Sequence, residues 1–276
     1  MNTTSIAVLG CGWLGLPLGS ALAQADYQVA GSTTTPEKLP RLEAAGIRPH
    51  LLQLSTATQP AEVAPLLAGA QVLVLNVPPS RTATDRAAYT AALAPVVVAL
   101  GSSPVQHVVF VSSTGVYPDE SRTMREADAA ATADAESHLL QAEALFRQAG
   151  QACQTTVLRL GGLMGPGRAP GRFLAGRTDV PQPNAPVNML HLDDAVGVIK
   201  AVIELNTWGQ TLNVCAPEHP SRMVFYTAAA THLGLQPPSF NARDERSGKL
   251  IDTAKLQQTL SYQFLHPEPI AALNFC

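Results

Sequence analysis

Two kinds of apolar pattern alternate through the first half of the chain. Short runs rich in β-branched residues predict strands, and longer runs with apolar residues at helical spacing predict helices. The nearly continuous apolar runs at 71–78 and 105–113 are typical of strands buried on both faces of a parallel sheet. The predicted strands span residues 5–10, 27–32, 47–55, 71–78, 105–113 and 155–162. The predicted helices span residues 13–25, 36–46, 84–101 and 133–150.

The pattern changes after this alternation. Residues 165–186 are rich in Pro, Gly and Arg and predict a long loop over the carboxyl edge of the sheet. A helix at 193–205 and a strand at 210–216 follow, and then short helices mixed with proline-rich loops. The predicted fold class is α/β: a Rossmann-type doubly wound parallel sheet with a small C-terminal substrate-capping lobe. We expect an NAD(P)-binding core at 1–164, a cleft loop at 165–189, a return to the core at 190–215 and the lobe at 216–276.

Composition and charge exclude several classes of partner. The 276 residues have a formal net charge of −3 and no basic run, so we expect neither a nucleic-acid nor a membrane-surface partner. The N-terminal region lacks the positive segment of a signal peptide, and other apolar stretches are too short to span a bilayer. We therefore expect a cytoplasmic protein. The four cysteines have no metal-ligand spacing, so we expect reduced thiols and no metal site.

Three glycines stand between the first predicted strand and the first predicted helix. Gly10, Gly12 and Gly15 form the pattern G-x-G-x-x-G. In a dinucleotide-binding βαβ unit the first glycine permits a tight turn, the second admits the pyrophosphate and the third lets the helix pack closely. We expect Trp13 and Leu14, at the helix N-terminus, to bind the cofactor with them. The alternative is a plain turn. Cys11 in this turn is either a redox thiol or a small turn residue, and we favour the latter.

The end of the second predicted strand bears on the choice of dinucleotide. An NAD site usually has an acid there, but the sequence has no Asp or Glu before Glu37. The hydroxyls of the 32–35 segment and the cation of Lys38 suit a 2′-phosphate, so we expect NADP, with NAD as the second choice. The expected contacts include Ser32, Thr33 and Thr34. The alternative is a polar loop in which Thr35 caps a helix that starts at Pro36.

Other expected cofactor contacts follow from the sheet. Ligands of doubly wound sheets bind beyond the carboxyl ends of the strands. We therefore expect contacts from Asn76, Val77 and Pro78 after the fourth strand, and from Ser112 near the end of the fifth.

Several later motifs resemble the extended short-chain dehydrogenase/reductase superfamily, in its NAD-dependent nucleotide-sugar epimerase and dehydratase group. They are "VVFVSSTGVYPD" at 108–119, "VLRLGGLMGPGR" at 157–168 and "VNMLHLDDAVGVIKAVIE" at 187–204. Together with "GCGWLG" at 10–15 they are most similar to the YeeZ-like branch of that superfamily. The resemblance covers nearly the whole chain. It implies an oxidoreductase or epimerase that acts on a small polar or anionic, nucleotide-linked substrate.

The resemblance also implies a catalytic group, which this chain does not fully carry. Ser113 corresponds to the family's catalytic Ser/Thr, although a turn cap is its alternative role. In the family this helix carries the pattern Tyr-x-x-x-Lys-x-x-x-Glu. Glu143 matches the final Glu, so the Tyr and Lys positions fall on Ala135 and Leu139. Neither residue supplies acid–base chemistry. His138 and Tyr117 are the candidate substitute acids. The alternative for His138 is a surface or helix-cap role, and the alternative for Tyr117 is a structural role.

The substrate contacts are expected in the later segments. Arg168, Arg172 and Arg177 lie in the predicted loop and either grip an anionic substrate or are ordinary solvated charges. His191 matches a family position near the substrate cleft. The leading interpretation is an NADP-dependent enzyme with an atypical active site, and the alternative is a non-catalytic NADP(H) sensor. The family also suggests a homodimer through the helices at 85–100 and 133–149, whose Ala-rich faces alternatively pack on the sheet.

Overall fold

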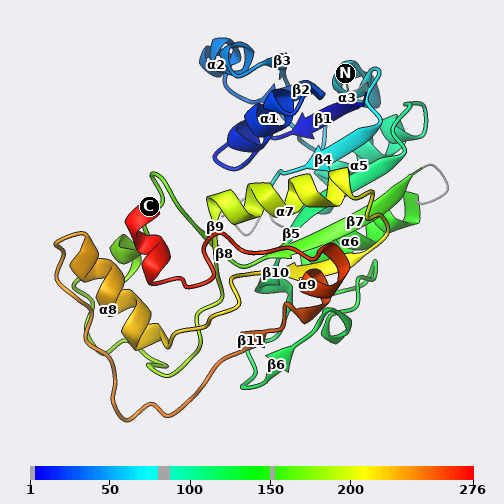
Figure 1. Cartoon of the computed structure of the whole chain (residues 1–276). Coiled ribbons are helices and arrows are strands. Elements are labelled where there is room, and N and C mark those ends of the chain that lie inside the picture. Colours follow the sequence, from blue (N-terminus) through cyan, green and yellow to red (C-terminus); the bar gives the residue numbers. More distant parts are fainter. Residues whose placement is uncertain (1–3, 80–87, 150–152) are drawn as a thin grey trace. The chain divides into compact units, whose positions relative to one another are not determined.

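The computed structural model describes residues 4–79, 88–149 and 153–276 (Figure 1). Within these ranges, seven parallel strands form one sheet in the order β10-β7-β5-β4-β1-β2-β3. The strands are β1 (Ser5–Leu9), β2 (Gln28–Thr33), β3 (Ile47–Leu51), β4 (Val72–Leu75), β5 (His107–Ser113), β7 (Gln154–Leu160) and β10 (Thr211–Val214). All seven predicted strands are confirmed. The strand order reverses beside β1, which makes this a doubly wound Rossmann-type sheet.

The register brings the carboxyl end of β1 to the switch point. Val8 lies opposite Gly31 of β2 on one side and Val74 of β4 on the other. The residues that follow β1, β2 and β4 therefore emerge at the same edge, where doubly wound sheets bind their ligands.

The predicted helices form, with corrected boundaries. They are α1 (Gly15–Gln24), the short η1 (Pro36–Lys38) with α2 (Leu39–Ala44), α5 (Tyr89–Leu100), α6 (His138–Gln148) and α7 (Leu192–Glu204). Residues 84–87 of the helix predicted at 84–101 lie outside the described residues. The helix predicted at 133–150 begins only at His138, because the segment before it turns: the Gln141 side chain donates to the Ala135 carbonyl and Ser137 is the N-cap. Residues 150–152 are not described.

One helix escaped the sequence analysis. α3 (Pro60–Leu67) begins with Pro at its first position and has a capping box between Gln59 and Glu62. Val63, Leu66 and Leu67 bury its apolar side. Its eight residues include Pro65, which masks the helical pattern because proline is rare inside helices.

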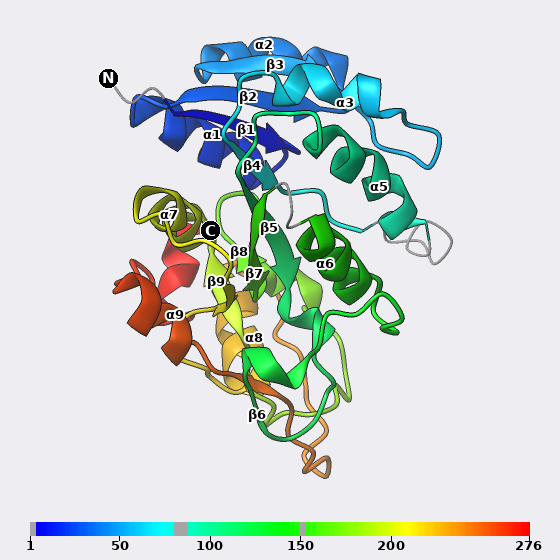
Figure 2. The same ribbon diagram turned by 90° about the vertical axis from the view of Figure 1, so that its right-hand side faces the viewer.

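The main core lies between the sheet and one layer of helices. α3, α5 and α6 lie along this side in Figure 2, and their buried residues join Leu73 of β4 and Phe110 of β5 in one cluster. Ala7 and Leu9 of β1 belong to the same cluster. Because side chains alternate along a strand, Ile6 and Val8 face the other side, where α1 contacts β1, β2 and β3. No helix in the described part of the chain is both long and apolar enough to cross a membrane.

The chain divides into two compact units. Unit 1 comprises Met1–Ser113, Ala130–Leu158 and Ile199–Thr211, and unit 2 comprises Thr114–Ala129, Arg159–Val198 and Leu212–Cys276. Unit 2 contains two small parallel pairs, β8 (Gly162–Met164) with β9 (Met189–His191), and β6 (Thr123–Met124) with β11 (Leu250–Ile251). It also contains α8 (Arg222–His232) and α9 (Ala254–Leu260).

Unit 2 has its own packing centre. Phe225 and Ala229 of α8 are buried with Met164, Met189 and Leu273. Gly171, in the single turn at Pro170–Phe173, permits a close approach to α8, because a Cβ there would lie 2.1 Å from the Ala229 carbonyl oxygen.

Candidate functional site

The glycine turn after β1 has two glycines that the fold itself requires. Gly10 has a φ of +102°, and a Cβ on it would lie 2.4 Å from the Asn76 carbonyl oxygen. A Cβ on Gly15, the first residue of α1, would lie 2.1 Å from the Gly10 carbonyl oxygen. Neither position has room for a side chain, so these two glycines shape the turn and bring α1 against it.

Gly12 differs from both. It is exposed, and no heavy atom would lie within 4 Å of a Cβ placed on it. The protein therefore leaves open the space beside Gly12. Trp13 is half-buried and Leu14 is buried, and α1 starts directly after them without a side-chain cap. The backbone N–H groups of such a helix start are suited to an anionic group, so the turn fits a dinucleotide pyrophosphate.

Two neighbouring strands hold this turn in place. The Asn76 Nδ2 atom donates to the Gly10 carbonyl at 3.0 Å, and the Gly10 N–H donates to the Ser32 hydroxyl at 3.0 Å. The Cys11 N–H donates to the Ser32 carbonyl at 2.7 Å. Asn76 and Ser32, both expected to contact the cofactor, thus hold the backbone of the glycine turn.

The residues at and beyond the carboxyl end of β2 separate into two groups. Ser32 and Thr33 are buried, and the Thr33 hydroxyl accepts a hydrogen bond from the Thr35 N–H at 3.2 Å. Thr34 and Lys38 are exposed. Thr35 does occupy the N-cap position before Pro36, but its side chain makes no capping hydrogen bond. Thr34 and Lys38 therefore present their side chains to solvent beyond the end of β2.

A cavity of about 440 Å³ lies in unit 1 beyond β4. Val77 and Pro78 line it, together with residues 53–56 and Tyr89, whose hydroxyl donates to the Val77 carbonyl at 2.7 Å. The strand predicted at 47–55 is too long: β3 ends at Leu51. Beyond it, Thr58 closes a turn by accepting from the Ser55 N–H and donating to the Gln53 carbonyl. Residues 53–56 thereby become part of a cavity wall that the sequence analysis missed.

Cys11 has no redox character in this setting. Burial raises the pKa of its thiol to about 12, with a hydrogen bond involving the Ser32 backbone opposing the rise. The Sγ atom contacts the Val8 carbonyl at 3.7 Å. The thiol therefore stays protonated at neutral pH, and Cys11 acts as a small turn residue.

The catalytic candidates of unit 1 lie at the carboxyl end of β5 and the start of α6. Ser113 is the last residue of β5 and is half-buried, and its neighbour Ser112 is buried. His138 is the first residue of α6, and its Nδ1 atom lies 3.4 Å from the Gln141 amide oxygen. Leu139 packs against the main core, and Ala135 precedes the helix. Leu139 thus has a packing role.

Tyr117 belongs to a buried polar network in unit 2. Its hydroxyl donates to the Asn213 amide oxygen at 2.6 Å and accepts from Arg159 at 2.8 Å. Burial raises the pKa of Tyr117, and the Arg159 charge opposes the rise. Arg159 also donates to the Glu126 and Ala129 carbonyls. These contacts give Tyr117 a structural role and leave little freedom for proton transfer.

The substrate candidates of unit 2 differ in exposure. Arg168, Arg172 and Arg177 are exposed, and Arg172 lies in the Pro170–Phe173 turn. His191, at the end of β9, is 2% exposed, and its Nε2 atom lies 3.1 Å from the Phe275 carbonyl. The arginines are thus accessible to an anion, whereas His191 is buried by the C-terminal residues.

Unit 2 also has a cavity of about 240 Å³ that the sequence analysis missed. Arg222, Tyr226 and Lys249 line it with Asp119 and Asn188. Lys249 donates to the Tyr117 carbonyl at 2.7 Å, and burial lowers the pKa of its amine. The Asn188 side chain bonds the backbone of Lys249 and Ile251 on either side of Leu250. Two cations and a tyrosine in one cavity suit an anionic, partly planar ligand. No local motif marks these residues, because they are far apart in sequence.

Comparison with known proteins now identifies the family. A family model described as NAD(P)H-binding matches residues 10–186, a range that includes the glycine turn, Asn76 and Ser113. Protein YeeZ of Escherichia coli strain K12 is 33% identical over 267 residues, which are 96% of this chain and 97% of YeeZ. The chain belongs to the NAD(P)H-binding family. The similarity to YeeZ, inferred from the motifs, is confirmed.

Solved structures in this group share the fold. MoeE5, in complex with UDP-glucuronic acid and NAD, has a TM-score of 0.76 and 20% identity, covering 99% of this chain and 98% of its own. The human epimerase family protein SDR39U1, with NADPH, has a TM-score of 0.71 and 16% identity, covering 98% of both chains. The NAD(P)H-binding protein described here thus has the fold of proteins that carry NAD or NADPH, and the open space at Gly12 agrees with the family.

Proposed function

We propose that this protein is an NADP(H)-dependent oxidoreductase or epimerase of the extended short-chain dehydrogenase type. The observation that carries the proposal is the glycine turn at residues 10–15, the candidate cradle for a pyrophosphate, together with the exposed Thr34 and Lys38 beyond the end of β2, where an NAD site has an acid. When bound, the nicotinamide supplies or accepts a hydride. The chain's own residues determine which dinucleotide binds and how the substrate and its proton are held.

The proposed cofactor site uses the N-terminus of α1 and the residues after β2, both in unit 1. Gly12, Trp13 and Leu14 hold the pyrophosphate on the α1 N-terminus, and Thr34 and Lys38 hold the 2′-phosphate. The adenine lies in the cavity bordered by Val77 and Pro78, whose apolar side chains and the Tyr89 ring suit a flat base. Ser32 and Asn76 support the cradle through the Gly10 backbone.

A titration with both dinucleotides tests the cofactor. A charge-assisted hydrogen bond contributes about 1.5–3 kcal/mol, so NADP(H) should bind at least about tenfold more tightly than NAD(H) by calorimetry. Lys38→Ala should remove most of this preference. Lys200→Ala, which removes a lysine paired with Glu204 on α7, is the matched control and should leave both affinities unchanged. Equal affinities in the wild-type protein, or tighter NAD(H) binding, would refute the NADP assignment.

The proposed substrate is a small anionic, nucleotide-linked compound bound through unit 2. Arg222, Lys249 and Tyr226 share a cavity there, and Arg168 and Arg172 are further exposed cations. UDP-glucuronic acid, the ligand of MoeE5, is a suitable probe. Its affinity should fall at least about tenfold in Arg222→Ala and stay unchanged in Arg41→Ala, an exposed arginine of α2.

The proposed active site lacks the usual proton donor. Ala135 and Leu139 stand where the family has Tyr and Lys, and general acid–base catalysis typically contributes about 10²–10⁴-fold. We therefore expect no detectable epimerase or dehydratase turnover with common nucleotide sugars. Ala135→Tyr with Leu139→Lys should not restore brisk activity, partly because Leu139 packs against the core. Rapid turnover by the wild-type protein that vanished in His138→Ala or Tyr117→Phe would identify a substitute acid.

The absent pair also favours a second candidate, a non-catalytic NADP(H) sensor. NADPH oxidation over a panel of carbonyl compounds and sugar nucleotides separates the two. Substrate-dependent oxidation that is lost in Ser113→Ala supports the enzyme. Tight NADPH binding with no turnover on any member of the panel supports the sensor.

A further inference from the structure

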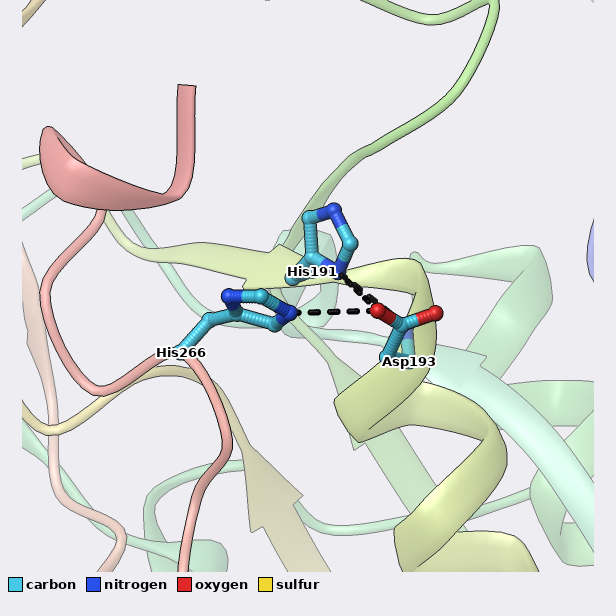
Figure 3. A group of neighbouring side chains, drawn as sticks. All are labelled: His191, Asp193 and His266. Atoms are coloured by element: carbon cyan, nitrogen blue, oxygen red, sulfur yellow. Dashed lines mark hydrogen bonds and ion pairs between the residues drawn. The ribbon is translucent and has the colours of Figure 1, made fainter. Parts of the chain in front are cut away.

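Three potential metal ligands converge in unit 2. His191 ends β9, Asp193 lies in the first turn of α7, and His266 lies in the loop after α9. The Asp193 Oδ2 atom is 3.3 Å from His191 Nδ1 and 3.1 Å from His266 Nε2. Figure 3 shows both rings directed at this carboxylate oxygen. One ligand atom from each residue lies within 4.8 Å of the other two.

The two separations from the Asp193 Oδ2 atom match the edges of a metal coordination shell. Metal–ligand bonds of about 2.0–2.1 Å at tetrahedral angles place neighbouring donor atoms about 3.3 Å apart. We propose that His191 Nδ1, the Asp193 carboxylate and His266 Nε2 bind one divalent transition-metal ion of the Zn²⁺ class. The site uses none of the side chains to which the proposed function assigns the cofactor or the substrate, and it does not rest on the proposed function.

The surroundings of His191 are those of a prepared ligand. Its ring is almost fully buried, and its Nε2 atom faces the Phe275 carbonyl at 3.1 Å. Metal-binding histidines commonly donate their second ring nitrogen to a carbonyl, which fixes the ring and leaves the first nitrogen as a lone-pair donor. Here that arrangement presents Nδ1 to Asp193.

Asp194 positions the third ligand. Its carboxylate is completely buried and accepts hydrogen bonds from the Leu265 and His266 N–H groups at 2.7 and 3.0 Å. It also accepts from the Tyr262 hydroxyl at 3.1 Å. These bonds fix the backbone at His266, so its imidazole is held beside Asp193 before any ion arrives. A rigid ligand loses little conformational entropy when it binds a metal.

The donor set indicates which cations fit. Two imidazoles and one carboxylate suit Zn²⁺ and related first-row ions, whereas Mg²⁺ and Ca²⁺ prefer oxygen ligands. The Asp193 side chain is 53% exposed, so water can complete the coordination from the solvent side. One existing contact opposes the ion, because the Asp193 N–H points at His191 Nδ1 at 3.2 Å and must give way to it. The bound ion would join the β9–α7 connection to the C-terminal segment.

Metal binding by the full, untagged chain tests the site. After treatment with a chelator, the wild-type protein should bind one equivalent of Zn²⁺ by calorimetry, and Co²⁺ should give the absorption of a low-coordinate site. His266→Ala and Asp193→Asn should each weaken Zn²⁺ binding at least about tenfold, because each removes a direct ligand. His232→Ala, at the exposed end of α8, is the matched control and should bind Zn²⁺ normally.

The outcomes distinguish the site from a metal-free cluster. Asp193→Asn changes the charge of an exposed side chain but not its size, so the fold should be kept. Unchanged NADPH binding in each variant would show that unit 1 is intact. Zn²⁺ should also raise the unfolding temperature of the wild-type protein and not that of Asp193→Asn. Failure of the wild-type protein to bind Zn²⁺, or equal binding by His266→Ala, would overturn the proposal and leave a hydrogen-bonded His–Asp–His cluster.

Discussion

The Ser112 hydroxyl donates a 2.6 Å hydrogen bond to the Glu143 carboxylate, and both side chains are buried. Ser112 belongs to β5 and Glu143 to α6, so this bond joins the carboxyl end of a central strand to the helix beside it. Glu143 is also the residue from which the family resemblance places the expected Tyr and Lys positions at Ala135 and Leu139. The bond anchors α6 to the sheet.

Removing the anchor should destabilise the fold. Ser112→Ala deprives a buried carboxylate of a charge-assisted partner, which typically costs about 1–3 kcal/mol of unfolding free energy. Urea unfolding followed by circular dichroism measures the change. Ser137→Ala is a suitable control, because Ser137 makes no capping hydrogen bond at the start of α6. Equal stability of the two variants would contradict the role of the Ser112–Glu143 bond.

The glycines of the turn should respond to substitution in opposite ways. Gly12→Val should leave the unfolding temperature nearly unchanged, because space surrounds a Cβ there, but should abolish dinucleotide binding by filling that space. Gly15→Ala should lower the unfolding temperature, because its Cβ would collide with the Gly10 carbonyl. Calorimetric titration and thermal unfolding of both variants check this. Normal NADPH binding by Gly12→Val would show that the turn is only structural.

An acid after β2 should reverse the proposed preference for NADP(H). Thr34→Asp places a carboxylate where the proposed 2′-phosphate lies, so NADP(H) affinity should fall at least about tenfold through charge repulsion. NAD(H) affinity should be kept or increased, because an acid there can accept from the ribose hydroxyl. Thr34→Asn, which is similar in size but neutral, is the control. An equal loss of both dinucleotides in Thr34→Asp would instead indicate a damaged cradle.

Stability should decline in alkaline solution. Burial raises the pKa of Cys11 from 9.0 to about 12, so the unfolded chain ionises this thiol at a lower pH than the folded chain. The contribution of Cys11 is complete below pH 9 and is lost between about pH 9 and pH 12, at up to about 1.4 kcal/mol per pH unit. Urea unfolding at pH 8 and pH 10 under reducing conditions measures the decline. Cys11→Ala should show a smaller decline than the wild-type protein, and an identical one would refute the assignment.

Local patterns were sufficient to determine the sheet. The seven strands could be predicted because each is a short apolar run bounded by turn residues, and their alternation with helices permits few topologies. The glycine turn at residues 10–15 was also predictable, since the strand, turn and helix that form it are consecutive in the sequence. Boundaries were less certain: β3 ends early where Thr58 closes a turn, and α6 starts late where Gln141 turns back to Ala135.

Long-range packing decided what the sequence left open. The sequence analysis considered metal-ligand spacing only among the cysteines, whereas His266 meets Asp193 from 73 residues away. That proximity depends on the Asp194 carboxylate, which binds the backbone beside His266. Arg222, at the start of α8, and Lys249, just before β11, likewise line one cavity only because unit 2 brings these two segments together. Contacts of this kind depend on the path of loops through space, and no local period or propensity encodes that path, so only the tertiary structure reveals them.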